Sequence, residues 1–226
     1  MERSGKSLII AIDGPAGSGK STVSKRLAEK LELLYIDTGA MYRALTLKAI
    51  NGGMDLDDGD SLTAMARFTA IDLKDENGSK KVFLDGKDVS LAIRTPELTS
   101  KVRFIARVPG VRHEMVKLQR SIGERQGAVL EGRDIGTVVF PDADYKFYLD
   151  ADPGERAKRR YKELLGSGRK VKLEEILKDV IERDESDMKR AVGALKKAKD
   201  SVVVDTTSLS IDEVVEKLFS HISEKK

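Results

Sequence analysis

The residues best suited to chemistry form one short loop. The segment Gly14-Pro15-Ala16-Gly17-Ser18-Gly19-Lys20-Ser21 matches the pattern G-x-x-x-x-G-K-[ST] at every fixed position. It follows the apolar run 8–12 and precedes apolar residues at helical spacing, so it joins a strand to a helix. Glycines let backbone N–H groups turn inward around an anion, and the helix N-terminus adds positive charge. The sequence predicts a phosphate-binding loop; the alternative is a glycine-rich turn that binds nothing.

Two side chains of this loop indicate a nucleoside triphosphate with its metal. Lys20 can reach the β- and γ-phosphates, and the Ser21 hydroxyl can ligate Mg²⁺. We therefore predict ATP and Mg²⁺ as ligands. The predicted ATP-binding residues are Gly14, Pro15, Ala16, Gly17, Ser18, Gly19, Lys20, Ser21 and Thr22.

Two further polar clusters follow apolar strands. Asp37-Thr38-Gly39-Ala40-Met41-Tyr42-Arg43 places a carboxylate, a hydroxyl and an arginine in one strand-to-helix turn, at the edge of the sheet where ligands bind. Taken alone, this cluster is better explained by an N-cap and a solvated arginine. Glu131-Gly132-Arg133-Asp134-Ile135-Gly136-Thr137 leaves a later buried strand. Its alternative explanation is a surface ion pair in a turn.

Later in the chain, arginines recur at helical spacing. Arg156, Arg159 and Arg160 share one helix face, and Arg183, Asp187 and Arg190 do so approximately. A basic helix face is usually only solvated. These arginines, however, bracket the glycine-containing stretch 166–170, which indicates a mobile lid over about 155–170. Arginines on a closing lid suit the charge that develops on a transferred phosphoryl group.

Composition limits the class of protein. The 226 residues are 40% hydrophobic and carry a net charge of +3, with basic residues interleaved with acids, which favours a local anionic ligand over a nucleic-acid duplex. No apolar run approaches the roughly 18 residues of a membrane helix, and no signal peptide is expected. The absence of cysteine excludes disulfides and thiolate–zinc sites, so a reducing cytoplasm is expected.

The elements that position these residues alternate along the chain. Strands are expected at 8–12, 33–36, 128–130, 145–149 and 201–204, and a helix at 40–50. Helix starts are expected after Asp152-Pro153 and at the capping box Ser210-x-x-Glu213. This pattern predicts an α/β fold, with a five-stranded parallel sheet flanked by helices on both faces.

The stretch from about 60 to 93 breaks this alternation. Residues 68–73 alternate like a half-buried strand, the turn-prone Glu76-Asn77-Gly78 follows, and 82–84 lead to a second turn at Asp85-Gly86. We predict a small antiparallel insertion within a single domain spanning 1–226.

Together these segments resemble the bacterial cytidylate kinases. The resemblance runs in order from about residue 8 to 220, and it is carried by 14–21, 37–43, Ile93-Arg94-Thr95, 132–143, Arg183-Asp184 and Arg190-Ala191-Val192. The phosphate loop is common to many nucleotide hydrolases, but the segment 132–143 is specific to this family. The resemblance implies a P-loop kinase core, an insertion that helps to bind the nucleoside monophosphate, and a helical lid. It also implies phosphorylation of CMP and dCMP with ATP and Mg²⁺, in pyrimidine metabolism.

The resemblance also implies roles for individual residues. The implied substrate-binding residues are Thr38, Arg43, Arg94, Arg112, Arg133, Asp134, Arg183, Asp187 and Arg190. Of these, Arg43, Arg133 and Arg190 would hold the CMP phosphate. Arg112, Asp134 and Arg183 would lie near the base, with Asp187 near the ribose. Where the family would place a small serine that touches cytosine, this chain has Arg103, with Ser100 one helical turn earlier, so that contact is not carried over.

We expect in-line transfer of the γ-phosphoryl group of ATP to an anionic oxygen of the CMP phosphate, which needs no strong general base. The predicted catalytic residues are Lys20, Arg133, Arg156 and Arg160. Ser21 would ligate Mg²⁺, with either Glu131 or Asp37 holding its waters. The expected partners are ATP and CMP or dCMP, with no nucleic acid and no membrane, and we expect a monomer.

Three other classes remain as rivals. Shikimate or dephospho-coenzyme A kinases share the phosphate loop, but the segment that begins at Gly132 argues against them. A regulatory GTPase would normally read guanine with Asn-Lys-x-Asp, whereas the only asparagines, Asn51 and Asn77, both precede glycine. The mild net charge argues against an ATPase acting on nucleic acid.

Overall fold

The computed structural model describes residues 7–76, 79–166 and 168–224. It divides the chain into two compact units, one of residues 1–35 and 123–226 and the other of 36–122. Within the described residues, no helix is both long enough and apolar enough to cross a membrane. The predicted turn at Asn77-Gly78 and the residue Ser167 of the predicted lid loop lie outside the described residues.

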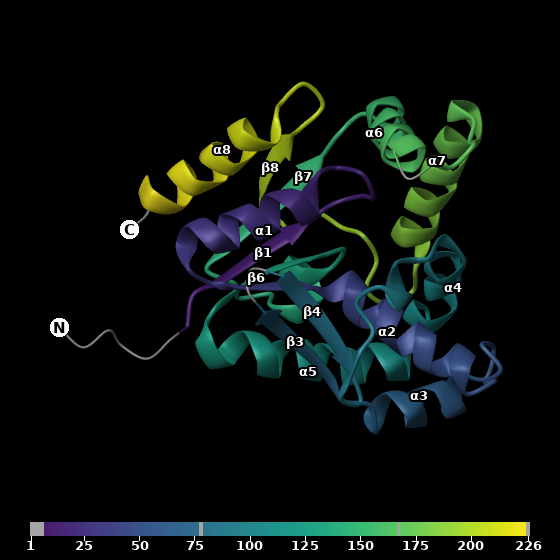
Figure 1. The fold of residues 1–226 in the computed structure, drawn as a ribbon. Coiled ribbons are helices and arrows are strands. Elements are labelled where there is room, and N and C mark those ends of the chain that lie inside the picture. Colours follow the sequence, from purple (N-terminus) through teal and green to yellow (C-terminus); the bar gives the residue numbers. More distant parts are fainter. Residues whose placement is uncertain (1–6, 77–78, 167, 225–226) are drawn as a thin grey trace. The chain divides into compact units, whose positions relative to one another are not determined.

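The main sheet has five strands in the order β2-β6-β1-β7-β8 (Figure 1). The strands are β1 (Ile9–Asp13), β2 (Leu34–Asp37), β6 (Ala128–Gly132), β7 (Tyr145–Asp150) and β8 (Val202–Asp205). Strand β1 pairs in parallel with β6 and β7, and β7 pairs in parallel with β8. The predicted five-stranded parallel sheet flanked by helices is confirmed, with strand ends shifted by one or two residues.

Two helices of the first unit cover one face of this sheet. Helix α1 (Lys20–Leu31) and helix α8 (Ile211–Glu224) lie side by side against it (Figure 1). Together they bury a core with the strands, which includes Ile10, Ile12, Leu27, Phe147 and Leu218. The apolar spacing that predicted these elements is therefore the spacing of the core side chains.

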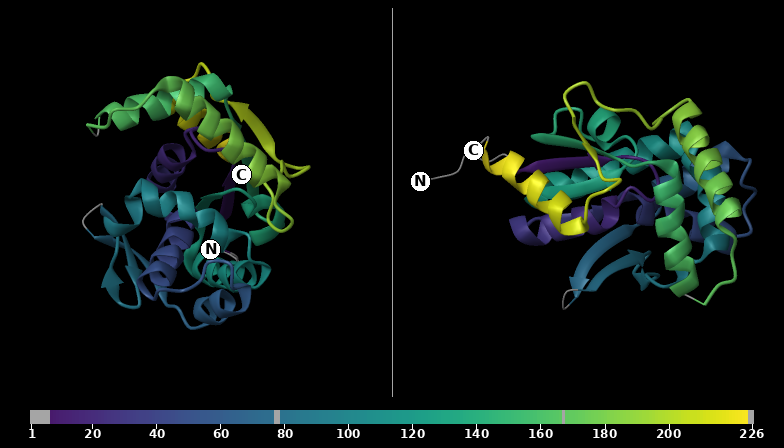
Figure 2. Two further views of the ribbon diagram at one scale, coloured as in Figure 1. Left: turned by 90° about the vertical axis from the view of Figure 1, so that its right-hand side faces the viewer. Right: turned by 90° about the horizontal axis from the view of Figure 1, so that it is seen from above.

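Helix ends follow the predicted capping signals. At the start of α8, the Ser210 hydroxyl accepts from the Glu213 N–H at 3.3 Å, and the Glu213 carboxylate accepts from the Ser210 N–H at 2.8 Å. This is the predicted capping box. At the start of α6 (Pro153–Gly166), the Asp152 carboxylate accepts from the Glu155 N–H at 3.1 Å. Helix α6 lies against α7 (Leu173–Lys189) (Figure 2). The two helices pack through Ala157, Ile176 and Val180.

A second, antiparallel sheet lies in the unit 36–122. Strands β3 (Ile71–Glu76), β4 (Ser79–Leu84) and β5 (Lys87–Asp88) pair in chain order. Asp85 and Gly86 both have positive φ, 48° and 80°, as a two-residue type I′ hairpin turn requires. The predicted small antiparallel sheet is confirmed. The helices of this unit are α2 (Thr38–Asn51), α3 (Gly59–Arg67), the 3₁₀ turn Ala92–Arg94, α4 (Pro96–Ala106) and α5 (Pro109–Gln126), whose last turn passes into the first unit.

The prediction of a strand beginning at Phe68 is wrong. Helix α3 begins after Asp58, whose carboxylate accepts from the N–H groups of Asp60 and Ser61, and it continues to Arg67. Phe68 is its C-cap, with an N–H directed at the carbonyls of Met65 and Ala66, and its side chain is 81% exposed. The cap at Asp58 starts a helix whose last turn overrides the local alternation, so the strand begins only at Ile71.

Candidate active site

The phosphate loop turns sharply between β1 and α1. Gly14, Gly17 and Gly19 have φ of 150°, 79° and 88°, a region that side-chain-bearing residues avoid. A Cβ on Gly14 would lie 2.0 Å from the Leu149 carbonyl oxygen, so only glycine fits there. Because α1 begins at Lys20, its positive N-terminal end opens onto the loop. The sequence motif thus has the strand–loop–helix context that phosphate binding needs.

Lys20 is buried beneath the loop and lies in a cationic environment. Its Nζ donates to the Pro15 carbonyl at 2.7 Å. Burial, and then the charges of Arg133 and Arg183, lower the pKa of Lys20 to about 7, against the opposing effect of Glu131 and Asp13. The free protein therefore holds Lys20 only partly protonated near neutral pH, and an anionic phosphate would complete its protonation.

This balance predicts that nucleotide binding takes up a proton. Because the pKa of Lys20 is lowered in the free protein, ATP binding at pH 8 is expected to draw protons from the buffer. The measurement is the calorimetric binding enthalpy of MgATP in buffers of different ionisation enthalpy. Lys20→Met serves as the matched control and should show no uptake. An equal proton count for the wild type and the variant would contradict the assignment.

The Ser21 hydroxyl points at a carboxylate from the neighbouring strand β6. It donates to Glu131 Oε2 at 2.9 Å, and the Tyr35 hydroxyl donates to Glu131 Oε1 at 2.5 Å. In the unit 36–122, the Asp37 carboxylate instead accepts from the Ala40 N–H and pairs with Arg43, both at 2.8 Å. Of the two predicted water-holding carboxylates, Glu131 is the one bonded to Ser21.

This hydroxyl and carboxylate fit a magnesium site. Among the described residues, no group of three or more His, Cys, Asp or Glu side chains is arranged to hold a metal. Mg²⁺ bound to a nucleotide usually keeps several waters and takes one or two protein oxygens together with phosphate oxygens. Ser21 and the buried Glu131 supply such oxygens beside the phosphate loop.

A cluster of opposite charges lies next to the phosphate loop. Arg133 Nε donates to Asp187 Oδ2 at 2.7 Å, and Arg190 pairs with the other oxygen of Asp187. Burial would raise the pKa of Asp187, but Arg133 and Arg190 hold it below its ordinary value. The structure thus brings together three of the predicted substrate-binding residues. Asp134, which follows Arg133 in the sequence, is also buried, whereas Arg183 is exposed on α7.

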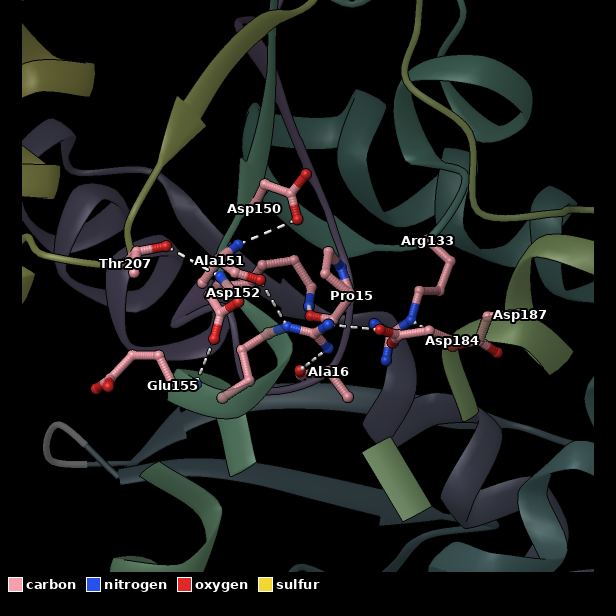
Figure 3. Close-up of polar contacts among 12 residues, drawn as sticks. Pro15, Ala16, Arg133, Asp150, Ala151, Asp152, Glu155, Asp184, Asp187 and Thr207 are labelled. Carbon is pink, nitrogen blue, oxygen red and sulfur yellow. Dashed lines mark hydrogen bonds and ion pairs between the residues drawn. The ribbon is translucent and has the colours of Figure 1, made fainter. Parts of the chain in front are cut away.

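Arg156, which the sequence predicts as a catalytic residue, is buried next to the phosphate loop. It is 2% exposed, and its guanidinium donates to three carbonyl or carboxylate groups: Ala151 at 2.9 Å, Ala16 of the phosphate loop at 3.0 Å, and Asp184 of α7 at 2.6 Å (Figure 3). In this structure Arg156, on α6, connects the phosphate loop to α7. Arg160 is more exposed and pairs with Glu163 within α6.

The unit 36–122 carries the remaining predicted substrate residues. Thr38 is buried at the start of α2, and Arg43 pairs with Asp37. Arg112 is 3% exposed, and its guanidinium carbon lies 5.6 Å from the centre of the Tyr42 ring. Arg94 is exposed and donates to the Ser90 carbonyl at 3.1 Å, and the exposed Arg103 lies over the Phe104 ring.

Asp13 is a site residue that the sequence prediction missed. It ends β1, directly before Gly14, and it is 4% exposed. Its two oxygens accept from the N–H groups of Ile135 and Gly136 at 2.8 and 2.7 Å. Burial is the main cause that raises its pKa to about 6. The signal in the sequence was a carboxylate at the end of an otherwise apolar strand. Such a residue is seldom buried without hydrogen-bond partners, so its position indicated a specific contact.

A phosphate loop at the end of a central parallel strand, with buried Lys20 next to an arginine–aspartate cluster, defines a P-loop kinase. Two solved structures share this fold. A shikimate kinase from Bacteroides thetaiotaomicron has a TM-score of 0.50 and 13% identity, over 96% of this chain and 98% of its own. An uncharacterized protein from Eubacterium ventriosum has a TM-score of 0.52 and 14% identity, over 96% of this chain and 98% of its own.

Sequence comparison narrows the class to one family. Residues 10–224 match the cytidylate kinase family model. The cytidylate kinase of Clostridioides difficile is 48% identical over 216 residues, covering 96% of this chain and 98% of the relative. The cytidylate kinase of Bacillus subtilis is 47% identical over 220 residues, covering 97% and 98%. The chain belongs to the cytidylate kinase family.

Proposed function

We propose that this protein transfers the γ-phosphoryl group of ATP to the phosphate of CMP, forming ADP and CDP. Membership of the cytidylate kinase family over nearly the whole chain carries this proposal. The site provides the matching chemistry, with a phosphate loop for the donor and an arginine cluster on the same unit for an anionic acceptor. The proposal also includes dCMP as an acceptor, and we propose that the protein is a monomer located in the cytoplasm.

The residues act on charge and alignment in this reaction. Lys20 neutralises the β- and γ-phosphates, and the glycines of the loop let backbone N–H groups surround them. Arg133 and Arg190 hold the acceptor phosphate, which is already an anionic nucleophile, in line with the γ-phosphorus. Ser21 and Glu131 would hold Mg²⁺, which when bound neutralises charge on the transferred group. Arg156 and Arg160 belong to the lid that excludes water, and closure would have to release Arg156 from its present partners.

A coupled assay of ADP release tests this proposal. The panel of acceptors is CMP, dCMP, UMP, AMP, shikimate and no acceptor. We expect rapid ADP release with CMP and dCMP, and a background rate with shikimate or no acceptor. A rate that does not depend on the acceptor would indicate an ATPase, and preference for shikimate would overturn the family assignment.

We expect Asp134, which is buried, to contribute to the base preference. Cytosine presents an amino donor at N4, which suits a carboxylate, whereas uracil presents a carbonyl acceptor at the same position. Mispairing of buried polar groups costs about 1–3 kcal/mol each, so we expect at least a roughly tenfold preference for CMP over UMP in kcat/KM. Asp134→Asn should narrow this gap because an amide can donate to the uracil carbonyl.

Steady-state kinetics with CMP, dCMP and UMP measure this effect in the wild type and in Asp134→Asn. Asp142→Asn removes a carboxylate from the exposed end of the same segment and is the matched control. Equal use of UMP and CMP by the wild type would refute the role of Asp134 and leave the kinase assignment standing.

A further inference from the structure

Asp13 joins the phosphate loop to the segment that carries the acceptor-binding residues. Its backbone continues into Gly14 of the loop, while its side chain holds the N–H groups of Ile135 and Gly136, 122 and 123 residues further along the chain. Gly132, the last residue of β6, lies beside Asp13 in the sheet register. Arg133 and Asp134 therefore lie between two backbone positions that are both tied to Asp13.

The segment after Asp134 depends on these two bonds for its shape. It forms a short π-helical turn over Ile135–Val139, in which the Val138 and Val139 N–H groups both donate to the Asp134 carbonyl, at 2.9 and 3.2 Å. The first N–H groups of a helical turn have no partner within the turn. The two oxygens of Asp13 accept from the first two of these groups, so a single carboxylate fixes where the turn begins.

Stability alone does not explain a carboxylate at this place. Burial disfavours its charged form, and neighbouring Asp134 adds to the effect, while the two N–H groups and Lys20 oppose it. The result is a pKa of Asp13 raised to about 6, so the charge costs folding stability at neutral pH. The titratable groups that face Asp13 are Asp134 on the acceptor segment, Lys20 on α1 and Tyr148 on β7. Groups that cost stability in this way concentrate at functional sites.

We propose that Asp13 is a positioning residue, which aligns Arg133 and Asp134 on the acceptor side with the phosphate loop on the donor side. This inference rests on the proposed function for its kinetic consequence but not for its structural one. Displacing a substrate-holding group by about 1 Å can cost on the order of 10² in rate. Loss of the second accepting oxygen at Asp13 should therefore slow transfer while leaving donor binding largely intact.

The first test compares Asp13→Asn with the wild type. An asparagine keeps the shape but turns one acceptor into a donor that faces an N–H group. We expect kcat/KM for CMP to fall by on the order of 10², and the Kd of ATP to change by less than about threefold. Asp144→Asn is the matched control, because Asp144 accepts from the Ile9 N–H at 2.8 Å at the other end of β1. It should stay within about twofold of the wild type in both quantities.

The second test uses only the unliganded wild-type protein and remains available if Asp13→Asn does not fold. The amide resonances of Ile135 and Gly136 should titrate together in NMR spectra, with a midpoint near the pKa of Asp13 of about 6. The Arg133 Nε–H and Asp134 amide resonances should shift with the same midpoint, because they lie on the segment that Asp13 holds. Their titration does not depend on which acceptor the enzyme uses.

Two outcomes would overturn the proposal. A folded Asp13→Asn protein with near-normal kcat/KM for CMP would show that the carboxylate is structural only. Titration of the Ile135 and Gly136 amides without any response at Arg133 or Asp134 would show that the two hydrogen bonds of Asp13 do not influence the acceptor residues. Failure of the wild type to use CMP would instead count against the proposed function, since the NMR result is independent of it.

Discussion

Replacing Lys20 with alanine is expected to lower the turnover of CMP by about 10²- to 10³-fold, the usual cost of removing a main electrostatic contact to the transition state. The fold should persist. The Lys20 ammonium donates to the Pro15 carbonyl, and burial of its charge is unfavourable, as its lowered pKa shows. The loss should therefore appear in chemistry and not in stability.

The measurements are single-turnover phosphoryl transfer and the thermal midpoint of unfolding. Lys25→Ala, on the same helix, is the matched control, since Lys25 is only partly buried and approaches Glu29 at 3.9 Å. Its turnover should equal that of the wild type. Near-normal turnover in a folded Lys20→Ala protein would remove the phosphate loop from the mechanism.

Those parts of the fold that local signals specify could be predicted from the sequence. The five strands of the main sheet are short apolar runs followed by helical spacing, and each lies within two residues of its predicted ends. The capping box at Ser210 needs contacts over only three residues. The strand expected from Phe68 failed because a cap ten residues earlier, at Asp58, had already started a helix.

The ties between distant segments could not be predicted in the same way. Asp13 and Gly136 are separated by 123 residues, and no local pattern links them. The spacing of Arg156, Arg159 and Arg160 predicts a common helix face but not what that face meets. Arg156 is buried against Ala16 and Asp184, whereas Arg160 stays near the surface with Glu163. Such differences arise from tertiary packing, which spacing along one helix does not encode.

These ties also bear on how the site changes during a catalytic cycle. The Asp187 carboxylate already forms ion pairs with Arg133 and Arg190, two of the residues proposed to hold the acceptor phosphate. A bound phosphate would compete with Asp187 for the same N–H groups, so acceptor binding exchanges one set of charge-assisted bonds for another. The cluster pairs both arginines before CMP arrives, which avoids leaving partly buried guanidinium groups without a counter-charge.

Arg133→Ala should impair the use of the acceptor CMP without a matching loss of affinity for the donor ATP. A charge-assisted hydrogen bond contributes about 1.5–3 kcal/mol, so kcat/KM for CMP is expected to fall by roughly 10- to 150-fold. ATP affinity should not fall in parallel, because the charge of Arg133 is one of the causes that lower the pKa of Lys20. Its removal favours the protonated lysine that the triphosphate needs.

Steady-state kinetics in CMP, with ATP affinity measured separately by calorimetry, would distinguish the two effects. Arg133→Lys keeps the charge without the planar fork and should give an intermediate loss. Arg26→Ala is the matched control, since Arg26 lies exposed on α1 and pairs with Asp212. Equal losses in the binding of both nucleotides would contradict the assignment of Arg133 to the acceptor phosphate, because a residue that serves only the acceptor has no reason to weaken the donor.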